Sequence, residues 1–412
     1  MPENDRYDVI IVGGSVGGCV LALCYARHNL RIAILEQRPE PTDYKTLCTH
    51  FVQPMALPVL FELGLDEALE ERGALRTKAA FWTAAGWIDP PEGYGVDSST
   101  AHAYNIERRL LDPFLRESVL RFESIDLCLG HRVVGVEPAN GEWRVEAIAE
   151  KKPRTLSARL VVAADGRHSQ MAKLSGNESE QQENQRSALF GYFEGIAAPD
   201  YNRSLFILSE PERGFLYPLC SGRTLLAQYV PKLGPEDWQS QRTSWADDVK
   251  AYFHRFRGVP DLSDGRLVSP VFGYSDYPNL ARKANWKGMA FIGDAALSLD
   301  PLSGVGCAFA MVGASLLANA TTVPLLQESG LDDGLAAYEA QFAKVILPHA
   351  RGIHADSLIA KSEATSLQTY RCIAGDPILQ RQFVDLTGRL ISPMAFQRAF
   401  TSAMVRAHLA VH

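Results

Sequence analysis

The first forty residues alternate between short, wholly apolar runs and one stretch with helical spacing. "YDVIIVGG" (7–14) is apolar and β-branched without alternation, which is typical of a strand buried on both faces in a parallel sheet. "VGGCVLALCYARHNL" (16–30) follows with helical spacing, and "RIAILEQR" (31–38) is a second apolar run. A strand, a glycine turn, a helix and a second strand within about 30 residues predict one βαβ unit.

The pattern continues with mixed elements as far as residue 166. We expect a helix at 55–65 and an amphipathic helix at 105–121. Residues 125–150 alternate and contain turn signals, which predicts strands, and 156–166 ("LSARLVVAADG") predicts another buried strand that ends at an acid. The apolar face of the amphipathic helix consists of Leu111, Phe114, Leu115 and Val119.

The second half of the chain predicts a different architecture. Residues 176–187 are a polar connection where the chain crosses between domains, and the alternating runs at 188–231 indicate an antiparallel sheet. A helix at 244–256, a strand–loop–helix at 289–320 and a mostly helical remainder from 330 follow. We therefore expect an α/β fold with four segments: a cofactor domain, first part (1–176), a β-rich substrate domain (177–280), the second part of the cofactor domain (281–330) and a helical C-terminal region (331–412).

Composition narrows the class of protein. The net charge of −7, without a basic stripe, argues against a nucleic-acid partner. The seven cysteines are scattered without a CxxC pair, which favours reduced thiols over a disulfide framework or a metal site. The N-terminus lacks the features of a signal peptide, and the apolar stretch 290–320 is interrupted by Asp294, Asp300 and Pro301, so we expect a cytoplasmic protein without a membrane span.

A glycine-rich turn, "GGSVGG", lies between the first strand and the first helix. Gly13 can make the tight turn, small Ser15 permits close approach to a pyrophosphate, and Gly18 lets the helix pack on the strand. Glu36 ends the second strand about 20 residues later, where a dinucleotide site needs an acid for the ribose 2′-hydroxyl. The alternative is a tight βα turn that binds nothing. The predicted cofactor contacts of this turn are Gly13, Gly14, Ser15, Val16, Gly17 and Gly18.

Two further motifs follow predicted strands. Asp165-Gly166 ends one strand and Gly293-Asp294 ends another, and a carboxylate there can accept hydrogen bonds from sugar or ribityl hydroxyls. The helix that begins near residue 306 would direct its positive end at a flavin pyrimidine ring. Each Asp-Gly pair taken alone also fits an ordinary turn. The loop before the helix contributes Pro301, Gly304, Val305 and Gly306 to the predicted site.

These three motifs, in this order, resemble the class A FAD-dependent monooxygenases of the para-hydroxybenzoate hydroxylase-like group, over roughly the first 320 residues. "ERRLLDPFL" matches the helix of that family and implies that Arg108 contacts FAD. Arg38, directly after the Glu36-Gln37 pair, matches a contact near the adenosine, and Gln37 is a further predicted cofactor contact. The resemblance implies a Rossmann-like FAD-binding domain interleaved with a β-sheet substrate domain and helical C-terminal segments. The sequence "GVGCAFA" (304–310) departs from the family pattern at Cys307. It is more similar to the broader superfamily that includes flavin halogenases and geranylgeranyl reductases.

The resemblance also suggests where a substrate would bind. Period-2 spacing puts alternate side chains of "RGFLYPLCSGRTLLAQYV" on one face, where Phe215, Tyr217 and Tyr229 could line an apolar pocket and Arg223 could hold a carboxylate or phenolate. Ordinary sheet packing and a solvated arginine are the alternative. The candidates beside the reacting ring are Lys45, His50 and Pro301.

The implied activity is the monooxygenation of an aromatic or olefinic small molecule. NADPH or NADH would reduce FAD in a transient visit, dioxygen would form a flavin C4a-hydroperoxide, and one oxygen atom would pass to the substrate. A flavin-dependent reductase of isoprenoid double bonds is one alternative, and a non-catalytic FAD-binding redox sensor is another. We expect a monomer or a homodimer.

Overall fold

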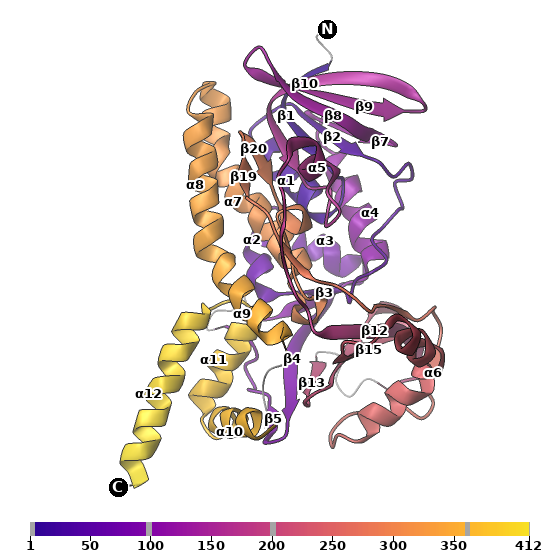
Figure 1. The fold of residues 1–412 in the computed structure, drawn as a ribbon, viewed down its shortest axis with the longest axis vertical. Coiled ribbons are helices and arrows are strands. Elements are labelled where there is room, and N and C mark those ends of the chain that lie inside the picture. Colours follow the sequence, from indigo (N-terminus) through magenta and orange to yellow (C-terminus); the bar gives the residue numbers. More distant parts are fainter. Residues whose placement is uncertain (1–4, 96–100, 198–202, 359–362, 412) are drawn as a thin grey trace.

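The computed structural model describes residues 5–95, 101–197, 203–358 and 363–411. Two large sheets are stacked along the long axis of the molecule, with helices on their faces and the C-terminal helices beside the second sheet (Figure 1). This is a mixed α/β fold, and it confirms the predicted fold class.

The first sheet has eight strands in the order β19-β20-β10-β1-β2-β7, with β9 and β8 continuing from β10. β1 pairs in parallel with both β2 and β10, because its residues are apolar on both faces and the whole strand centre is buried. The strands are β1 (Arg6–Val12), β2 (Ile32–Glu36), β7 (Ile125–Leu129), β8 (Arg132–Ala139), β9 (Glu142–Ala149), β10 (Lys152–Ala163), β19 (Asn285–Trp286) and β20 (Met289–Phe291).

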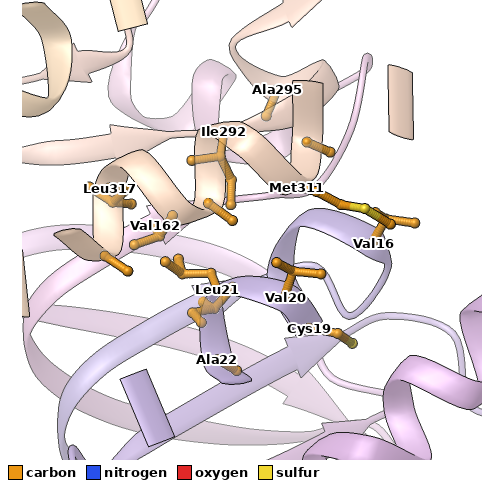
Figure 2. Packing of buried hydrophobic residues seen from close by; sticks show 14 of the residues in the cluster. Val16, Cys19, Val20, Leu21, Ala22, Val162, Ile292, Ala295, Met311 and Leu317 are labelled. Atoms are coloured by element: carbon orange, nitrogen blue, oxygen red, sulfur yellow. The ribbon is translucent and has the colours of Figure 1, made fainter. Parts of the chain in front are cut away.

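Helix α1 (Val16–Ala26) packs against α7 (Gly306–Gln327) on one face of this sheet. Figure 2 shows Val20 and Leu21 of α1 close to Met311 and Leu317 of α7 in a continuous apolar core. Both helices are apolar around most of their circumference, as expected of helices covered by other elements. In the described ranges α7 is the one helix that is long and apolar enough to cross a membrane, and 61% of its most apolar window is buried within the protein.

The second sheet has ten strands and two covered faces. Helix α6 (Pro235–His254) covers one face, and α10 (Glu363–Ala374), α11 (Pro377–Thr387) and α12 (Pro393–Val411) cover the other. The strands are β3 (Phe51–Val52), β4 (Leu75–Thr83), β5 (Gly86–Ile88), β6 (Ala103–Asn105), β12 (Arg186–Glu194), β13 (Arg203–Leu208), β14 (Arg213–Pro218), β15 (Thr224–Pro231), β16 (Arg266–Leu267) and β17 (Phe272–Tyr274).

The second sheet is built from two distant stretches of chain. β4 pairs in parallel with β13, and β3 and β6 extend the sheet beyond β4. The 51–105 stretch lies within the segment 1–176 that the sequence assigned to the cofactor domain, yet its strands belong to this sheet. The chain therefore crosses between the two sheets more often than the four predicted segments require.

Shorter elements connect the sheets. The polar connection at 176–187 contains β11, which joins two other short strands in a three-stranded antiparallel sheet. The helix expected at 105–121 is α4, and the helix expected at 55–65 is a short turn followed by α2. These elements are β11 (Glu180–Gln182), β18 (Asn279–Ala281), β21 (Leu297–Ser298), α2 (Leu57–Glu62), α3 (Asp66–Glu71), α4 (Arg108–Val119), α5 (Gln170–Ser175), α8 (Leu331–Val345) and α9 (Leu347–Ser357).

Candidate functional site

A cavity of about 680 Å³ runs from the carboxyl ends of β1, β2 and β10 to the second sheet. The three sequence motifs, which are far apart along the chain, all contribute to its wall. The predicted site residues that line it are Gly13, Ser15, Val16, Gly17, Glu36, Gln37, Arg38, Lys45, Arg108, Asp165, Gly166, Tyr229, Gly293, Asp294, Pro301, Gly304, Val305 and Gly306.

The glycine-rich turn has the backbone that its sequence predicts. Gly13 has a φ of +113°, and a Cβ on it would lie 2.4 Å from the Ala164 carbonyl oxygen. A Cβ on Gly18 would lie 1.9 Å from the Gly13 carbonyl oxygen, so only glycine permits this contact between helix and strand. No side chain caps α1 and its first turn has no acid, which leaves its free N–H groups available to a diphosphate.

Glu36 is buried beside the turn, with 5% of its surface exposed. Its Oε2 accepts the Gly14 N–H at 2.7 Å and its Oε1 accepts the Arg38 N–H at 2.9 Å. A carboxylate has about four lone-pair sites, so it can hold the turn and still accept a ribose hydroxyl. The residue at this position therefore both shapes the turn and fits an adenosine ribose.

Arg108 begins α4, and its largely buried side chain forms part of the cavity wall. Its guanidinium makes a two-point contact with Asp112 at 2.8 and 2.9 Å and donates to Ser15 Oγ at 2.7 Å. Because Asp112 offsets the charge of Arg108, the main contribution of Arg108 is to hold Ser15, the residue that precedes α1, in place. Arg116, on the same helix, donates from Nε to the Gly14 carbonyl at 2.9 Å, and the sequence analysis did not identify it.

Lys45 and Asp294 form an ion pair at the cavity wall, with Nζ 2.8 Å from Oδ2. The Asp294 carboxylate raises the pKa of Lys45 although burial opposes it. The Lys45 N–H also donates to Asp112 at 3.0 Å, so the segment after β2 is tied to α4. Lys45 and Asp294 thus face the same part of the cavity, where the motif predicts a ribityl chain.

In the Asp165-Gly166 motif, the Asp165 carboxylate bonds groups at the start of α5. Asp165 accepts from Ser169 Oγ at 2.6 Å and from the Met171 N–H at 2.9 Å, and burial raises its pKa. The next arginine, Arg167, lies over the Tyr277 ring at 3.9 Å, and both residues line the cavity. Asp165 therefore organises the turn into α5, while Arg167 supplies the positive charge at this wall.

The inner end of the cavity is aromatic and lies on the second sheet. Phe51, Phe190, Tyr229 and Tyr274 line it, and Tyr229 is 2% exposed. The predicted residues Phe215 and Tyr217 are not among the lining residues. They stack on each other at 5.6 Å one layer further into the core, where Phe215 also contacts Tyr229 at 5.1 Å.

Two other predicted residues, His50 and Arg223, do not line the cavity. Arg223 makes two contacts of 2.7 Å with Glu107, so its charge is already matched. His50 lies behind the wall: its Nδ1 accepts the Arg108 N–H at 3.1 Å, which leaves Nε2 to bond the Tyr192 hydroxyl at 2.6 Å.

A buried ionic network that the sequence analysis did not identify supports the loop before α7. Asp300 is 1% exposed, lines the cavity and accepts from Arg186 at 2.8 Å and from the Tyr274 hydroxyl at 3.2 Å. Arg186 also bonds Asp356 on α9, which pairs with Arg213 of β14 at 2.7 Å. The network joins the loop, the second sheet and the C-terminal helices through partners that are distant in sequence.

Cavity residues outside the motifs complete the site. Cys48 and Cys307 line the wall near Arg108, and His131 and Arg132 line the far end beyond Arg38. In the ranges that the structure describes, no group of three or more His, Cys, Asp or Glu side chains is arranged to hold a metal ion.

Comparison with known families and proteins agrees with this geometry. The family model described as "FAD binding domain" matches residues 6–348. The chain is 23% identical over 377 residues to a digeranylgeranylglycerophospholipid reductase of Thermoplasma acidophilum, covering 88% of this chain and 89% of that protein. It is 25% identical over 350 residues to the FAD-dependent monooxygenase esdpE of Penicillium shearii, covering 76% and 68%.

Solved structures share the fold. The p-nitrophenol 4-monooxygenase PnpA of Pseudomonas putida superposes with a TM-score of 0.78 at 16% identity, covering 94% of this chain and 99% of that one. The flavin-dependent brominase Bmp2 superposes with a TM-score of 0.75 at 15% identity, covering 97% and 100%. At these identities the likeness establishes the fold and leaves the reaction open.

Proposed function

The chain belongs to the FAD binding domain family of class A flavin monooxygenases, and from this premise we propose that it oxygenates a neutral aromatic or olefinic small molecule. Bound FAD would supply the redox chemistry, taking electrons from NADPH or NADH and activating dioxygen. The protein has to bind the flavin, exclude water and hold the substrate beside the ring.

The residues of the cavity fit these tasks. The uncapped start of α1 would receive the diphosphate, Glu36 the adenosine ribose and Asp294 the ribityl hydroxyls. At the opposite wall, α7 begins with an uncapped turn without acids, so its positive end would stabilise negative charge on the ring. Pro301 and Gly304 would keep the backbone of this loop close to the flavin.

One observation carries the proposal: a single cavity joins the glycine-rich turn to an aromatic end on the second sheet. Asp300, which bonds the Tyr274 hydroxyl at this end, is already paired with Arg186. An uncharged ring or double bond would therefore be matched by Phe190, Tyr229 and Tyr274 without leaving a buried charge unpaired.

Screening followed by isotope labelling tests the proposal. The purified holoenzyme is screened for substrate-dependent oxygen consumption with NADPH or NADH, and the product is analysed by mass. We expect one atom from labelled dioxygen in the product.

A variant of the aromatic end tests substrate binding. Tyr229→Phe should weaken substrate binding by about 0.5–1.5 kcal/mol if the hydroxyl bonds the substrate. Tyr217→Phe is the matched control one layer deeper.

A reductase is the second candidate, because two named relatives have this activity. Besides the Thermoplasma reductase, the chain is 25% identical over 370 residues to a menaquinone reductase of Mycolicibacterium smegmatis, covering 85% and 82%. A cavity end lined by aromatic rings, with its carboxylate already paired, would also accept an isoprenoid chain. Anaerobic turnover that saturates a double bond, with no labelled oxygen in the product, would favour this candidate over the monooxygenase.

A further inference from the structure

Two cysteine side chains meet inside the cavity although the chain separates them widely. Cys48 lies in the segment after β2, and Cys307 is the second residue of α7. The two thiols lie close enough for each to shift the pKa of the other, and both residues line the cavity wall. Both residues therefore form part of the wall that a small molecule in the cavity would contact.

The surroundings of this pair favour a thiolate. The His50 backbone N–H donates to Cys48 Sγ at 3.3 Å, and Arg108 Nη1 lies 3.8 Å from Cys307 Sγ. Cys307 lies in the first turn of α7, but the neighbouring Cys48 and burial raise the pKa of its thiol, so the negative charge of the pair resides on Cys48. The neighbouring Cys307 thiol is the main cause that holds the pKa of Cys48 below its usual range, against the effect of burial.

The other cysteines provide a contrast within the same chain. Burial raises the pKa of Cys19 and of Cys24 to about 12, and it also raises the pKa of Cys128. Cys128 is partly exposed, as Cys48 is, but lies outside the cavity lining. It is a suitable internal reference because exposure alone would make the two thiols equally reactive.

We propose that Cys48 and Cys307 form a peroxide-reactive dithiol at the cofactor cavity, with Cys48 as the attacking thiol and Cys307 as the resolving thiol. The Cys48 thiolate attacks one peroxide oxygen, the O–O bond breaks, and sulfur is oxidised to a sulfenic acid while the peroxide is reduced to hydroxide or alkoxide. The Cys307 thiol then attacks the Cys48 sulfur; an S–S bond forms and water leaves.

The disulfide would have a mechanical effect on the site. It would tie the segment that contains Lys45 to the start of α7, two parts of the wall of the cofactor cavity. Bound FAD should then exchange more slowly, and a thiol reductant should restore the original rate. A flavoprotein that loses reducing equivalents to oxygen produces hydrogen peroxide beside this pair, but the dithiol chemistry depends only on the presence of a peroxide.

Peptide mass analysis of the holoenzyme treated with hydrogen peroxide tests the proposal. We expect an intramolecular Cys48–Cys307 disulfide that dithiothreitol removes. In Cys307→Ser, dimedone should trap a sulfenic acid on Cys48, and in Cys48→Ser, Cys307 should stay reduced at the same dose. Cys128 should react at least about tenfold more slowly, as a difference of one pKa unit implies. Retention of the FAD absorbance spectrum reports that each variant is folded.

Labelling of the unmodified wild type with iodoacetamide gives a second measurement that needs no variant. Cys48 should be alkylated first among the seven cysteines. Oxidation of Cys128 as fast as Cys48, a disulfide between other cysteines, or the absence of a sulfenic acid in Cys307→Ser would overturn the proposal. Because peroxide is added directly, none of these outcomes bears on whether the enzyme oxygenates or reduces its substrate.

Discussion

Replacing Arg186 by methionine should destabilise the protein strongly, because it leaves a charge unpaired inside the fold. Arg186 and Asp300 are 3% and 1% exposed in their side chains, and their closest N–O distance is 2.8 Å. Methionine has a similar length and removes the cation without opening a large cavity. Breaking a buried pair from one side costs about 3–5 kcal/mol, since the remaining ion keeps its desolvation penalty.

Urea unfolding of the wild type, Arg186→Met and Arg186→Met/Asp300→Asn measures this cost. The double variant should recover a large part of the loss, because the buried carboxylate has been neutralised while the Tyr274 hydroxyl can still bond the amide oxygen. Arg144→Met is the matched control: Arg144 pairs with Glu137, and these side chains are 45% and 53% exposed. It should cost at most about 1 kcal/mol.

The reasoning fails if Arg186→Met stays within about 1 kcal/mol of the wild type, which is the range of an exposed pair. It also fails if the double variant is no more stable than the single one, because the loss would then come from packing. A further consequence concerns the site, since Asp300 precedes the loop at Pro301–Ser303. FAD affinity should fall together with stability in the single variant.

Three other changes test the site and the core. In Glu36→Gln, one of the two backbone N–H groups that the carboxylate accepts would face the NH2 group of the amide. The loss of about 1.5–3 kcal/mol should raise the dissociation constant of FAD about ten- to a hundredfold, as measured by titration of the apoprotein. Gly18→Ala should prevent FAD binding or folding because of the 1.9 Å approach to the Gly13 oxygen, whereas Gly17→Ala meets atoms no closer than 3.5 Å and should fold normally by circular dichroism. Burial lowers the pKa of His349 to about 4, so the imidazole is buried in its neutral form. The free energy of unfolding of the wild type should therefore fall by on the order of 3 kcal/mol as the pH falls from about 6.5 to about 4. His349→Gln should show a flatter dependence of this free energy on pH.

The first βαβ unit could be predicted because its determinants are local. β1 and β2 are apolar on both faces, and the glycines at 13 and 18 are required by contacts within the unit itself. For the same reason the order of the three motifs along the chain was enough to indicate a family. The match of the FAD binding domain family over residues 6–348 confirms that family.

Pairings between distant segments could not be predicted in this way. Alternation indicated that Arg223 lies on a defined face of its hairpin, but it carried no information about Glu107, which binds it from a different segment. The parallel pairing of β4 with β13 depends on a partner more than a hundred residues later, and neither strand contains a signal for it. Arg186, the ion-pair partner of Asp300, is likewise more than a hundred residues away in the sequence.

The interleaved course of the chain limits how the protein can be divided or recombined. No single cut separates the two sheets, because β4 from the N-terminal part is an internal strand beside β13 of the second sheet. A fragment limited to residues 177–280 would expose the edge of β13 and would be prone to aggregate through it. Contacts of this sequence separation also slow folding, since a long loop must close before they form. Transplanting a substrate sheet from a relative would therefore require exchange of at least two stretches of chain, one on each side of α4.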